Sequence, residues 1–372
     1  MRVLVVTVTA GNGHNQTAKA LVESLENRGA EVQLLDLYQY ISRTLYRVVD
    51  QGYLFSVRHM PRRFGKTYAV LERRGVRQRV LGLLNSNRIL AGRLAGFLRE
   101  FNPEVIVTTH VFGAQVLDVL KRQKHLNTPV IGIVTDFCFH PFWEAVPSVE
   151  HIVTASESMR YAAKRRGIEE ERLLPLGIPI AEKFSRSVAK EEARVRLGLA
   201  ADLRTILIMG GSMGYGNLCD YVSQIDQMDG AFQIVCITGS NKKVYEEIEQ
   251  MKVKKPLHLQ GFTDCVDLYM DAADCIVTKP GGLTVSESLA KGLPMVLVSP
   301  IPGQEERNTG FLLNSGAAVL VDRHVSITQA LDFVFGQAER IEIMKAAIRL
   351  IARPHATAEI SNFVESLVEK GQ

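Results

Sequence analysis

Short apolar runs rich in valine, isoleucine and leucine alternate with helix-forming stretches along most of the chain, and this alternation limits the fold more than any other feature. At the N-terminus, an apolar run over 2–9 precedes helical spacing over 16–28, and a second apolar run follows over 32–35. Strands that alternate with helices in this way form a parallel sheet whose faces the helices cover. The sequence therefore predicts a β-α-β unit at its start.

The same alternation continues in two series. In the first series we expect further strands at 105–109, 130–134 and 152–154. Two helices are expected between and after them, near 113–124 and 158–166. In the second series we expect strands at 205–209, 232–237, 275–277, 295–298 and 318–321. Because 372 residues exceed what one hydrophobic core usually organises, we predict an α/β protein with two doubly wound parallel-sheet domains.

The boundary between the domains is expected where the apolar rhythm breaks. The stretch 177–201 carries many charges, so it is interpreted as a linker between a first domain over 1–178 and a second over 179–354. Pro354 interrupts the last helical stretch, and proline removes a backbone donor and kinks a helix. The segment after it, about 355–372, is assigned to the first domain.

Composition and charge exclude several other classes of protein. With 46% hydrophobic and 23% charged residues, the chain is neither disordered nor fibrous. The N-terminal apolar run ends in glycines rather than in a small-residue cleavage site, so it is a strand and not a signal peptide. No window approaches 18 uninterrupted apolar residues, so no segment is expected to span a bilayer. The net charge of +4 is too small to indicate nucleic-acid binding, and five scattered cysteines fit reduced thiols in the cytosol.

Positive charge is concentrated in one segment, between Arg43 and Arg99. It holds thirteen arginine or lysine residues, Arg62 and Arg63 among them, against two acidic residues, and aromatic side chains such as Phe55 lie between them. Such a segment can sit at an anionic lipid surface, where each basic residue adds about 1 kcal/mol. A solvated helical face is the alternative interpretation, and it is the commoner one for an isolated run of charge.

A glycine turn, Gly11-Asn12-Gly13-His14, joins the first strand to the first helix, where an open α/β sheet presents its ligand crevice. A dinucleotide fingerprint would need glycine at position 16, but Gln16 stands there. The glycines alone fit a tight turn equally well. His14 is more informative, because an imidazole at an exposed strand-to-helix turn titrates near neutral pH and can serve as a general base.

Three more turns follow strands of the second series. The turn Gly210-Gly211-Ser212-Met213-Gly214 should present backbone N–H groups to an anion such as pyrophosphate, and it lacks the lysine of a P-loop. The segment 278–287 is again a strand, a glycine turn and a helix start. Thr284 and Glu287 share a helix face there, and a capping box is the structural alternative for them. The stretch 302–308 places amide and carboxylate groups at the same sheet edge, where they can hold sugar hydroxyls.

Together these turns resemble glycosyltransferase family 28, which includes the lipid II-forming N-acetylglucosaminyltransferase and the diacylglycerol glycosyltransferases. Four motifs of this chain resemble the donor half of that family. They are Gly210 to Gly214, Gly261-Phe262-Thr263-Asp264, Gly281 to Glu287, and Gln304 to Asn308. In the first half, Gly11 to His14 and the stretch 135–143 (TDFCFHPFW) resemble the processive diacylglycerol β-glucosyltransferases and the monogalactosyldiacylglycerol synthases. The resemblance covers nearly the whole chain. It implies the GT-B fold, with two Rossmann-like domains and a cleft between them.

The resemblance also implies roles for individual residues. His14 would be the general base or would orient the acceptor, with Asp136 as its rival. The uracil would lie on Phe262 and the backbone of Thr263, and Glu287 would hold the ribose hydroxyls. The other donor-binding residues would be Gly13, Gly211, Ser212, Gly281, Gly282 and Thr284 around the phosphates, and Gln304, Glu305 and Asn308 around the hexose. The acceptor or the membrane would face His140, Trp143, Phe55, Arg62 and Arg63.

The expected activity is the transfer of a hexose, with inversion, from a UDP-sugar to the 3-hydroxyl of 1,2-diacylglycerol at the cytoplasmic face of the cell membrane. Glucose is favoured, whereas galactose, repeated rounds of transfer and the oligomeric state stay open. We expect anionic lipids as the surface and no metal or other cofactor, because the amides of the glycine turns can neutralise the diphosphate. A lipid II-type enzyme, a UDP-sugar epimerase and a non-catalytic UDP-sugar sensor are the alternatives.

Overall fold

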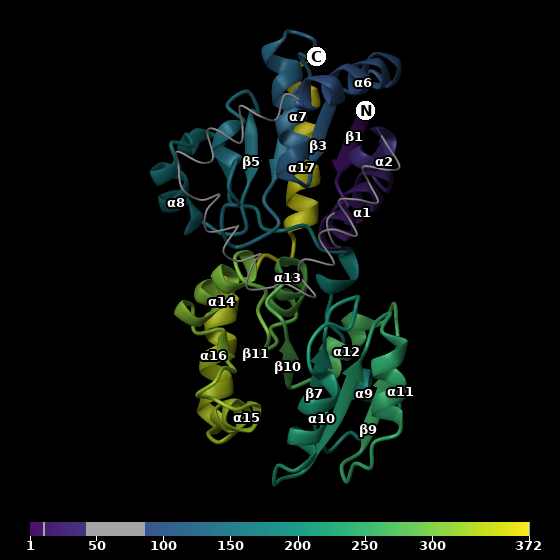
Figure 1. The fold of residues 1–372 in the computed structure, drawn as a ribbon, viewed down its shortest axis with the longest axis vertical. Coiled ribbons are helices and arrows are strands. Elements are labelled where there is room, and N and C mark those ends of the chain that lie inside the picture. Colours follow the sequence, from purple (N-terminus) through teal and green to yellow (C-terminus); the bar gives the residue numbers. More distant parts are fainter. Residues whose placement is uncertain (10–11, 42–85, 372) are drawn as a thin grey trace. The chain divides into compact units, whose positions relative to one another are not determined.

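The chain forms two compact units, each built on its own parallel sheet (Figure 1). The computed structural model describes residues 1–9, 12–41 and 86–371. Unit 1 comprises Met1–Glu182, Ile301–Gln304 and His355–Gln372, and unit 2 comprises Lys183–Pro300 and Glu305–Pro354. Among the residues so described, none of the helices combines the length and the apolar character that crossing a membrane requires.

Unit 1 contains a six-stranded parallel sheet with the strand order β2-β1-β3-β4-β5-β6. Its strands are β1 (Arg2–Thr7), β2 (Glu31–Asp36), β3 (Val105–Thr108), β4 (Val130–Ile133), β5 (His151–Val153) and β6 (Leu173–Leu174). The strand β1 pairs with β2 on one side and with β3 on the other, so the strand order reverses there. Ligands of open α/β sheets bind beyond the carboxyl ends of the strands at such a reversal.

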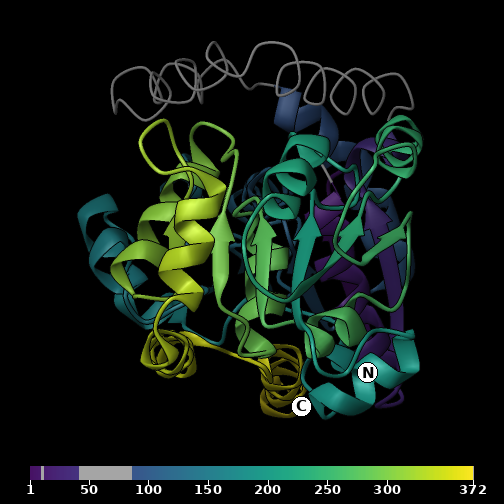
Figure 2. The ribbon, with the colours of Figure 1, turned by 90° about the horizontal axis from the view of Figure 1, so that it is seen from below.

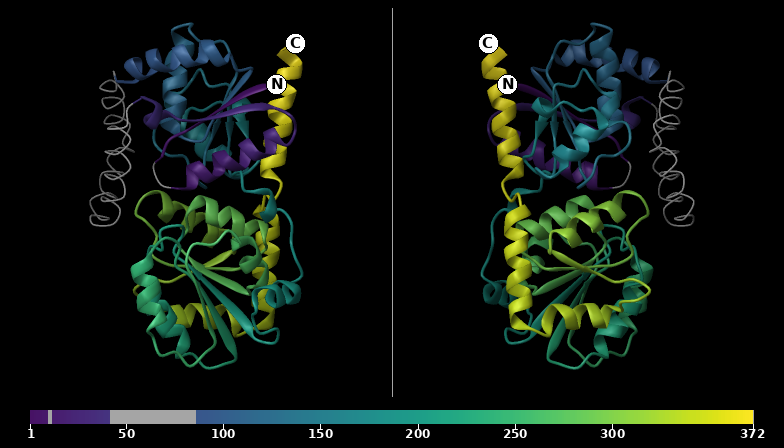
Figure 3. Two further views of the ribbon diagram at one scale, coloured as in Figure 1. Left: turned by 90° about the vertical axis from the view of Figure 1, so that its right-hand side faces the viewer. Right: turned by 90° about the vertical axis from the view of Figure 1, so that its left-hand side faces the viewer.

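Helices cover the sheet of unit 1, and the last helix of the chain is one of them. The helices are α1 (Asn12–Glu26), α2 (Leu37–Ile41), α6 (Ser86–Phe101), α7 (Val111–Arg122), α8 (Met159–Arg166) and α17 (Ala356–Gly371), with short 3-10 turns η1 (Trp143–Ala145) and η2 (Glu170–Arg172). Figure 3 shows α17 beside α1, and Arg28 of α1 forms an ion pair of 2.8 Å with Glu365 of α17. Ile360 and Val364 of α17 are fully buried in the core of unit 1.

Unit 2 repeats the architecture with the strand order β12-β11-β10-β7-β8-β9. Its strands are β7 (Arg204–Met209), β8 (Phe232–Ile237), β9 (Leu257–Gln260), β10 (Cys275–Thr278), β11 (Met295–Leu297) and β12 (Ala318–Leu320). The strand β7 pairs with β8 on one side and with β10 on the other. The reversal of strand order in unit 2 therefore lies between β7 and β10.

The helices of unit 2 pack around this sheet, whose strands lie side by side in Figure 2. They are α9 (Lys190–Leu197), α10 (Leu218–Asp226), α11 (Lys242–Glu249), α12 (Val266–Ala272), α13 (Gly282–Ala290), α14 (Gln304–Asn314), α15 (Ile327–Phe335) and α16 (Ala338–Ile351), and a 3-10 turn η3 (Glu182–Phe184) precedes them. The core between the sheet and helices α10 and α15 is formed by branched aliphatic side chains such as Ile206, Val222 and Leu331. These three side chains are fully buried, as expected for parallel strands covered by helices.

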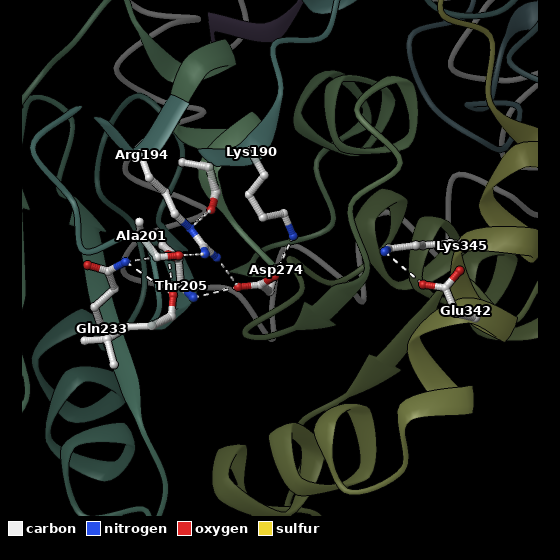
Figure 4. Close-up of polar contacts among 10 residues, drawn as sticks. Lys190, Arg194, Ala201, Thr205, Gln233, Asp274, Glu342 and Lys345 are labelled. Atoms are coloured by element: carbon white, nitrogen blue, oxygen red, sulfur yellow. Dashed lines mark hydrogen bonds and ion pairs between the residues drawn. The ribbon is translucent and has the colours of Figure 1, made fainter. Parts of the chain in front are cut away.

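Asp274 organises the amino-terminal end of β10 (Figure 4). Its carboxylate accepts hydrogen bonds from Lys190 Nζ at 2.5 Å, from Arg194 Nη2 at 2.7 Å and from the backbone N–H of Thr205 at 2.7 Å. Arg194 also donates to the carbonyl oxygen of Ala201 at 2.8 Å. This network ties α9 and the start of β7 to β10.

Three details differ from what the sequence predicted. The stretch 177–201 is not simply a linker, because it contains η3 and α9. The C-terminal helical stretch is not one kinked helix, because α16 ends at Ile351 and α17 begins only at Ala356, after Pro354. Two strands, β6 and β9, were not predicted, and both occupy edges of their sheets.

Candidate active site

His14 lies at the reversal of strand order in unit 1. It belongs to the first turn of α1, the helix that follows β1 in the chain, and its ring nitrogen Nδ1 lies 2.8 Å from the carbonyl oxygen of Thr109 and 3.0 Å from Oγ1 of Thr135. Thr109 follows the end of β3 and Thr135 lies two residues after the end of β4. The carboxyl ends of three neighbouring strands therefore hold one imidazole.

The hydrogen bond to Thr109 determines which nitrogen of His14 is basic. A carbonyl oxygen only accepts, so Nδ1 carries the proton and Nε2 keeps its lone pair. Burial lowers the pKa of His14 below its ordinary value, and the hydrogen bond to Thr109 opposes this in part. The imidazole is thus neutral at neutral pH, with Nε2 available as a base.

A second imidazole, which sequence reasoning did not select, lies beside His14. The ring of His110 is 4.6 Å from that of His14, in an edge-to-face arrangement. His110 caps helix α7, since its Nδ1 accepts a hydrogen bond from the backbone N–H of Phe112 at 3.1 Å. Burial holds the pKa of His110 well below its ordinary value, and the neighbouring His14 and His140 lower it further. Its position directly after Thr109 at a strand end is the signal that could have revealed it.

The segment 135–143 runs along the same edge of the sheet of unit 1, and the structure corrects one prediction in it. Asp136 and His140 are half-buried. Trp143 is only 2% exposed, and its ring packs on Gly132 of β4. A Cβ atom at Gly132 would lie 2.5 Å from Cζ3 of Trp143. The prediction that Trp143 faces lipid is therefore wrong, because this glycine leaves room for the indole in the core.

The remaining predictions about acceptor and membrane contacts fall on Phe55, Arg62 and Arg63. These residues lie outside the described residues, as does Gly11. Gly13 is described and lies in the first turn of α1, where a Cβ atom would meet no neighbour within 4 Å. Gly13, the residue before His14, is therefore not crowded by other atoms.

In unit 2, the turn after β7 has a backbone that only glycine adopts readily. Gly211 and Gly214 have positive φ angles of 70° and 56°. A Cβ atom at Gly214 would lie 2.2 Å from the carbonyl oxygen of Thr238, so the turn packs closely on the end of β8. The carbonyl oxygen of Ser212 accepts a hydrogen bond from the backbone N–H of Ser240 at 2.9 Å. The backbone of Ser212 is therefore held by the segment that follows β8, the neighbouring strand.

The turn after β10 begins helix α13 without a side-chain cap. Gly281 is the N-cap residue, and as a glycine it has no side chain with which to cap the first turn. The capping box considered for Thr284 and Glu287 does not form, because the helix begins at Gly282 and both residues lie inside it. The first amides of α13, near the turn after β7, are therefore available to an anion.

An ion pair that the sequence did not reveal lies between these two turns. Nζ of Lys279 is 2.5 Å from Oε1 of Glu305, and both side chains are largely buried. Asn308 is also buried, and its side chain donates to the carbonyl oxygen of Pro280 at 3.0 Å. Gln304 begins α14 and is half-buried. Asn308 therefore supports the turn after β10, and its contact with the hexose stays a prediction.

Three further donor-site candidates, Phe262, Thr263 and Glu287, also lie in unit 2. The side chain of Phe262 is 65% exposed, which suits a surface on which a uracil ring could stack. Thr263 Oγ1 accepts a hydrogen bond from the backbone N–H of Cys265 at 3.2 Å. Burial raises the pKa of Glu287 to about 8; Asp267 adds to this and Lys183 opposes it. Among residues 1–9, 12–41 and 86–371, no three His, Cys, Asp or Glu side chains gather in a way that could hold a metal ion.

Comparisons with known proteins agree with this organisation. The model of monogalactosyldiacylglycerol (MGDG) synthase matches residues 14–180, and the model of the glycosyltransferase family 28 C-terminal domain matches residues 205–351. The chain is 28% identical to a processive diacylglycerol beta-glucosyltransferase of Bacillus pumilus, over 99% of this chain and 95% of that protein. It is 26% identical to monogalactosyldiacylglycerol synthase 2, chloroplastic, of Arabidopsis thaliana, over 99% of this chain and 81% of that protein.

Solved structures share the fold at lower identity. MurG of Acinetobacter baumannii matches with a TM-score of 0.65 at 16% identity, over 98% of this chain and 99% of that one. A UDP-GlcNAc 2-epimerase from Neisseria meningitidis matches with a TM-score of 0.59 at 14% identity, over 99% and 100%. The two sheets and these likenesses confirm the predicted GT-B fold with two Rossmann-like domains. With both of its halves matched, the chain belongs to glycosyltransferase family 28, and its N-terminal half is of the monogalactosyldiacylglycerol synthase type.

Proposed function

We propose that this glycosyltransferase transfers a hexose from a UDP-sugar to the 3-hydroxyl of 1,2-diacylglycerol, with inversion at the anomeric carbon. Glucose is the favoured hexose. The curated relatives support this acceptor, because one is named a diacylglycerol glucosyltransferase and the other a monogalactosyldiacylglycerol synthase. Their names differ in the sugar, so the donor has to be settled by experiment.

The observation that carries the proposal is the neutral imidazole of His14. Its Nδ1–H is bound by the carbonyl oxygen of Thr109, which leaves Nε2 as the base. In the proposed reaction Nε2 takes the proton of the lipid hydroxyl as the hydroxyl oxygen attacks the anomeric carbon. The bond between that carbon and the diphosphate oxygen breaks, and UDP leaves with the electron pair.

The leaving diphosphate would be stabilised by groups of unit 2. The turn after β7 and the uncapped start of α13 follow the two strands between which the order of the sheet reverses, and both can present backbone N–H groups to an anion. We propose that these groups make a divalent metal unnecessary. Activity is therefore expected to persist in excess chelator, and its loss with recovery on adding metal would contradict this part.

The acceptor is a membrane lipid, so the enzyme has to work at a membrane surface. We propose a peripheral association with the cytoplasmic face of the cell membrane, supported by the cationic segment between Arg43 and Arg99 in the sequence. Binding to anionic liposomes should then weaken as the salt concentration rises, because salt screens exposed charges. Binding that salt leaves unchanged would contradict the role of this segment.

The test is an incubation with labelled UDP-glucose and labelled UDP-galactose in parallel, with diacylglycerol in anionic liposomes. Label should pass from one of the two donors into the extracted lipid, and the number of sugars per lipid shows whether transfer is repeated. The product should be the β-anomer if the donor is α-linked. Label that stays in the water-soluble fraction with both donors would rule out the proposed transfer.

A further inference from the structure

We propose that Lys279 is a diphosphate-binding residue that Glu305 holds in place until the donor arrives, and that the lysine then exchanges the carboxylate for the diphosphate. Freed in this way, Glu305 becomes an acceptor for a hydroxyl of the hexose. The inference rests on the proposed function, because the ligand is the diphosphate of a UDP-sugar. It adds a cation and an exchange step to the backbone amides already proposed to bind the diphosphate.

The position of Lys279 in unit 2 is the first argument. Lys279 directly follows β10, at the carboxyl end where the strand order reverses between β10 and β7. Its Nζ lies 2.5 Å from Oε1 of Glu305, and the two side chains are 19% and 9% exposed. Burial raises the pKa of Tyr215, on the turn after β7; Glu305 raises this pKa further and Lys279 opposes the rise. The pair thus lies inside the site rather than on the outer surface.

The second argument is that the lysine touches both glycine turns. A Cβ atom at Gly211 would lie 3.3 Å from Cε of Lys279. A Cβ atom at Gly281 would lie 3.2 Å from Nζ of Lys279 and 3.5 Å from Oε1 of Glu305. Glycine at both positions therefore leaves space for the ammonium group between the turn after β7 and the start of α13.

The electrostatics explain why the pair is needed in the absence of donor. A charge that is largely removed from water needs an opposite charge beside it. The carboxylate of Glu305 lies 2.5 Å from Nζ of Lys279 and provides that charge, so the cation is already in place when the donor binds. A diphosphate carries more negative charge than a carboxylate and also meets the amides of α13, so it competes successfully for the lysine.

The exchange gives Glu305 two successive tasks. Before the donor binds, its carboxylate neutralises Lys279. Once Lys279 has turned to the diphosphate, the same carboxylate can accept a hydrogen bond from a sugar hydroxyl. The order of events links recognition of the hexose to the presence of the diphosphate, because the carboxylate is occupied until then.

The experiment measures the binding of UDP and of uridine, which lacks the diphosphate, by calorimetry. In Lys279→Met the affinity for UDP should fall about 10- to 100-fold, whereas the affinity for uridine should stay within about twofold. Lys279→Arg keeps the charge and should retain most of the affinity for UDP. Glu305→Gln frees the lysine beforehand, so UDP should bind at least as tightly as to the unaltered protein, while the turnover of the UDP-sugar should fall.

Lys190→Met is the matched control, because Lys190 forms an ion pair of the same length with Asp274 at the opposite end of β10 (Figure 4). It should leave the affinity for UDP unchanged. Equal losses of UDP and uridine affinity in Lys279→Met, or weaker UDP binding in Glu305→Gln, would overturn the exchange while leaving the proposed function intact. An unaltered protein that binds neither UDP nor uridine would instead overturn the proposed function and this inference with it.

Discussion

Thr109 holds His14 through two groups: its carbonyl oxygen lies 2.8 Å from the ring nitrogen Nδ1, and its hydroxyl donates to the backbone carbonyl oxygen of His14 at 3.3 Å. Oγ1 of Thr7 on β1 lies 3.1 Å from the same hydroxyl, whose single proton is shared between these two acceptors. These contacts fix the imidazole of His14 and the start of α1 to the strands β1 and β3. A base that is positioned before the substrate arrives loses little entropy during the reaction, so this arrangement favours catalysis.

His14→Gln should abolish most of the turnover and leave donor binding intact. Glutamine keeps a polar side chain of similar reach but cannot take a proton, and general-base catalysis typically contributes about 10²- to 10⁴-fold to a rate. The measurement is transfer of label to diacylglycerol, beside calorimetric titration with UDP. His125→Gln, at an exposed position of the same unit, is the control and should behave like the unaltered protein. A variant of His14 that retains full turnover would show that another residue, such as Asp136, is the base.

The pH dependence of kcat/KM should have an acid limb whose midpoint lies below pH 6.5. Protonated His14 cannot act as a base, so activity falls as the pH drops through the pKa of the imidazole. Burial lowers that pKa from 6.5, so the midpoint of the acid limb should lie below pH 6.5. The residual activity of His14→Gln should lack this limb. A midpoint above pH 6.5 would contradict the buried neutral imidazole.

The fluorescence of Trp143 should not respond to lipid. Trp143 is the single tryptophan of the chain and is 2% exposed in the core of unit 1. Acrylamide should quench it poorly, and vesicles made with brominated lipids should leave its emission unchanged even when sedimentation shows the protein to be bound. The double variant Trp143→Phe/Tyr161→Trp places the indole at a position that is 72% exposed, where acrylamide should quench it strongly. Quenching of Trp143 by brominated lipid would restore the membrane-facing interpretation.

Asp274→Asn should destabilise unit 2 by about 3 kcal/mol. The substitution leaves Arg194 and Lys190 beside a neutral amide, and breaking a buried charged network in this way typically costs about 3–5 kcal/mol. Lys190 is partly exposed, so the lower end of this range applies. Urea unfolding followed by circular dichroism measures the loss. Glu342→Gln removes an exposed ion pair with Lys345, also drawn in Figure 4, and should cost less than about 0.5 kcal/mol. Equal effects of the two substitutions would contradict the special position of Asp274.

The strands that form the two sheets were predictable because each is a run of buried apolar residues. The predicted strand 232–237 coincides with β8, and each of the other predicted strands matches one of the structure to within two residues at either end. The edge strands β6 and β9 were missed for physical reasons. The first pairs only Leu173 and Leu174, and the second, over Leu257–Gln260, is half-buried and carries a histidine and a glutamine, which gives it no apolar run.

The site was only partly predictable. His14 could be found because it stands in a glycine turn after a strand. The partnership of Lys279 with Glu305 could not, because it joins residues 26 apart whose approach depends on how β10 and α14 are placed. The burial of Trp143 was missed in a similar way. Its aromatic neighbours in the sequence suggested a surface, whereas Gly132, eleven residues earlier on β4, decides where the indole goes.

The packing of α17 on α1 has a consequence for how the chain is made. Unit 2 lies between the segments of unit 1 along the chain, and Ile360 and Val364 of α17 complete the core of unit 1. During synthesis on the ribosome, unit 2 can therefore close its own core while the N-terminal unit still exposes the apolar side of α1. Unit 1 is thus the first to emerge from the ribosome and the last to complete its core. A nascent chain stalled before Ala356 would expose the apolar side of α1, to which chaperones are expected to bind.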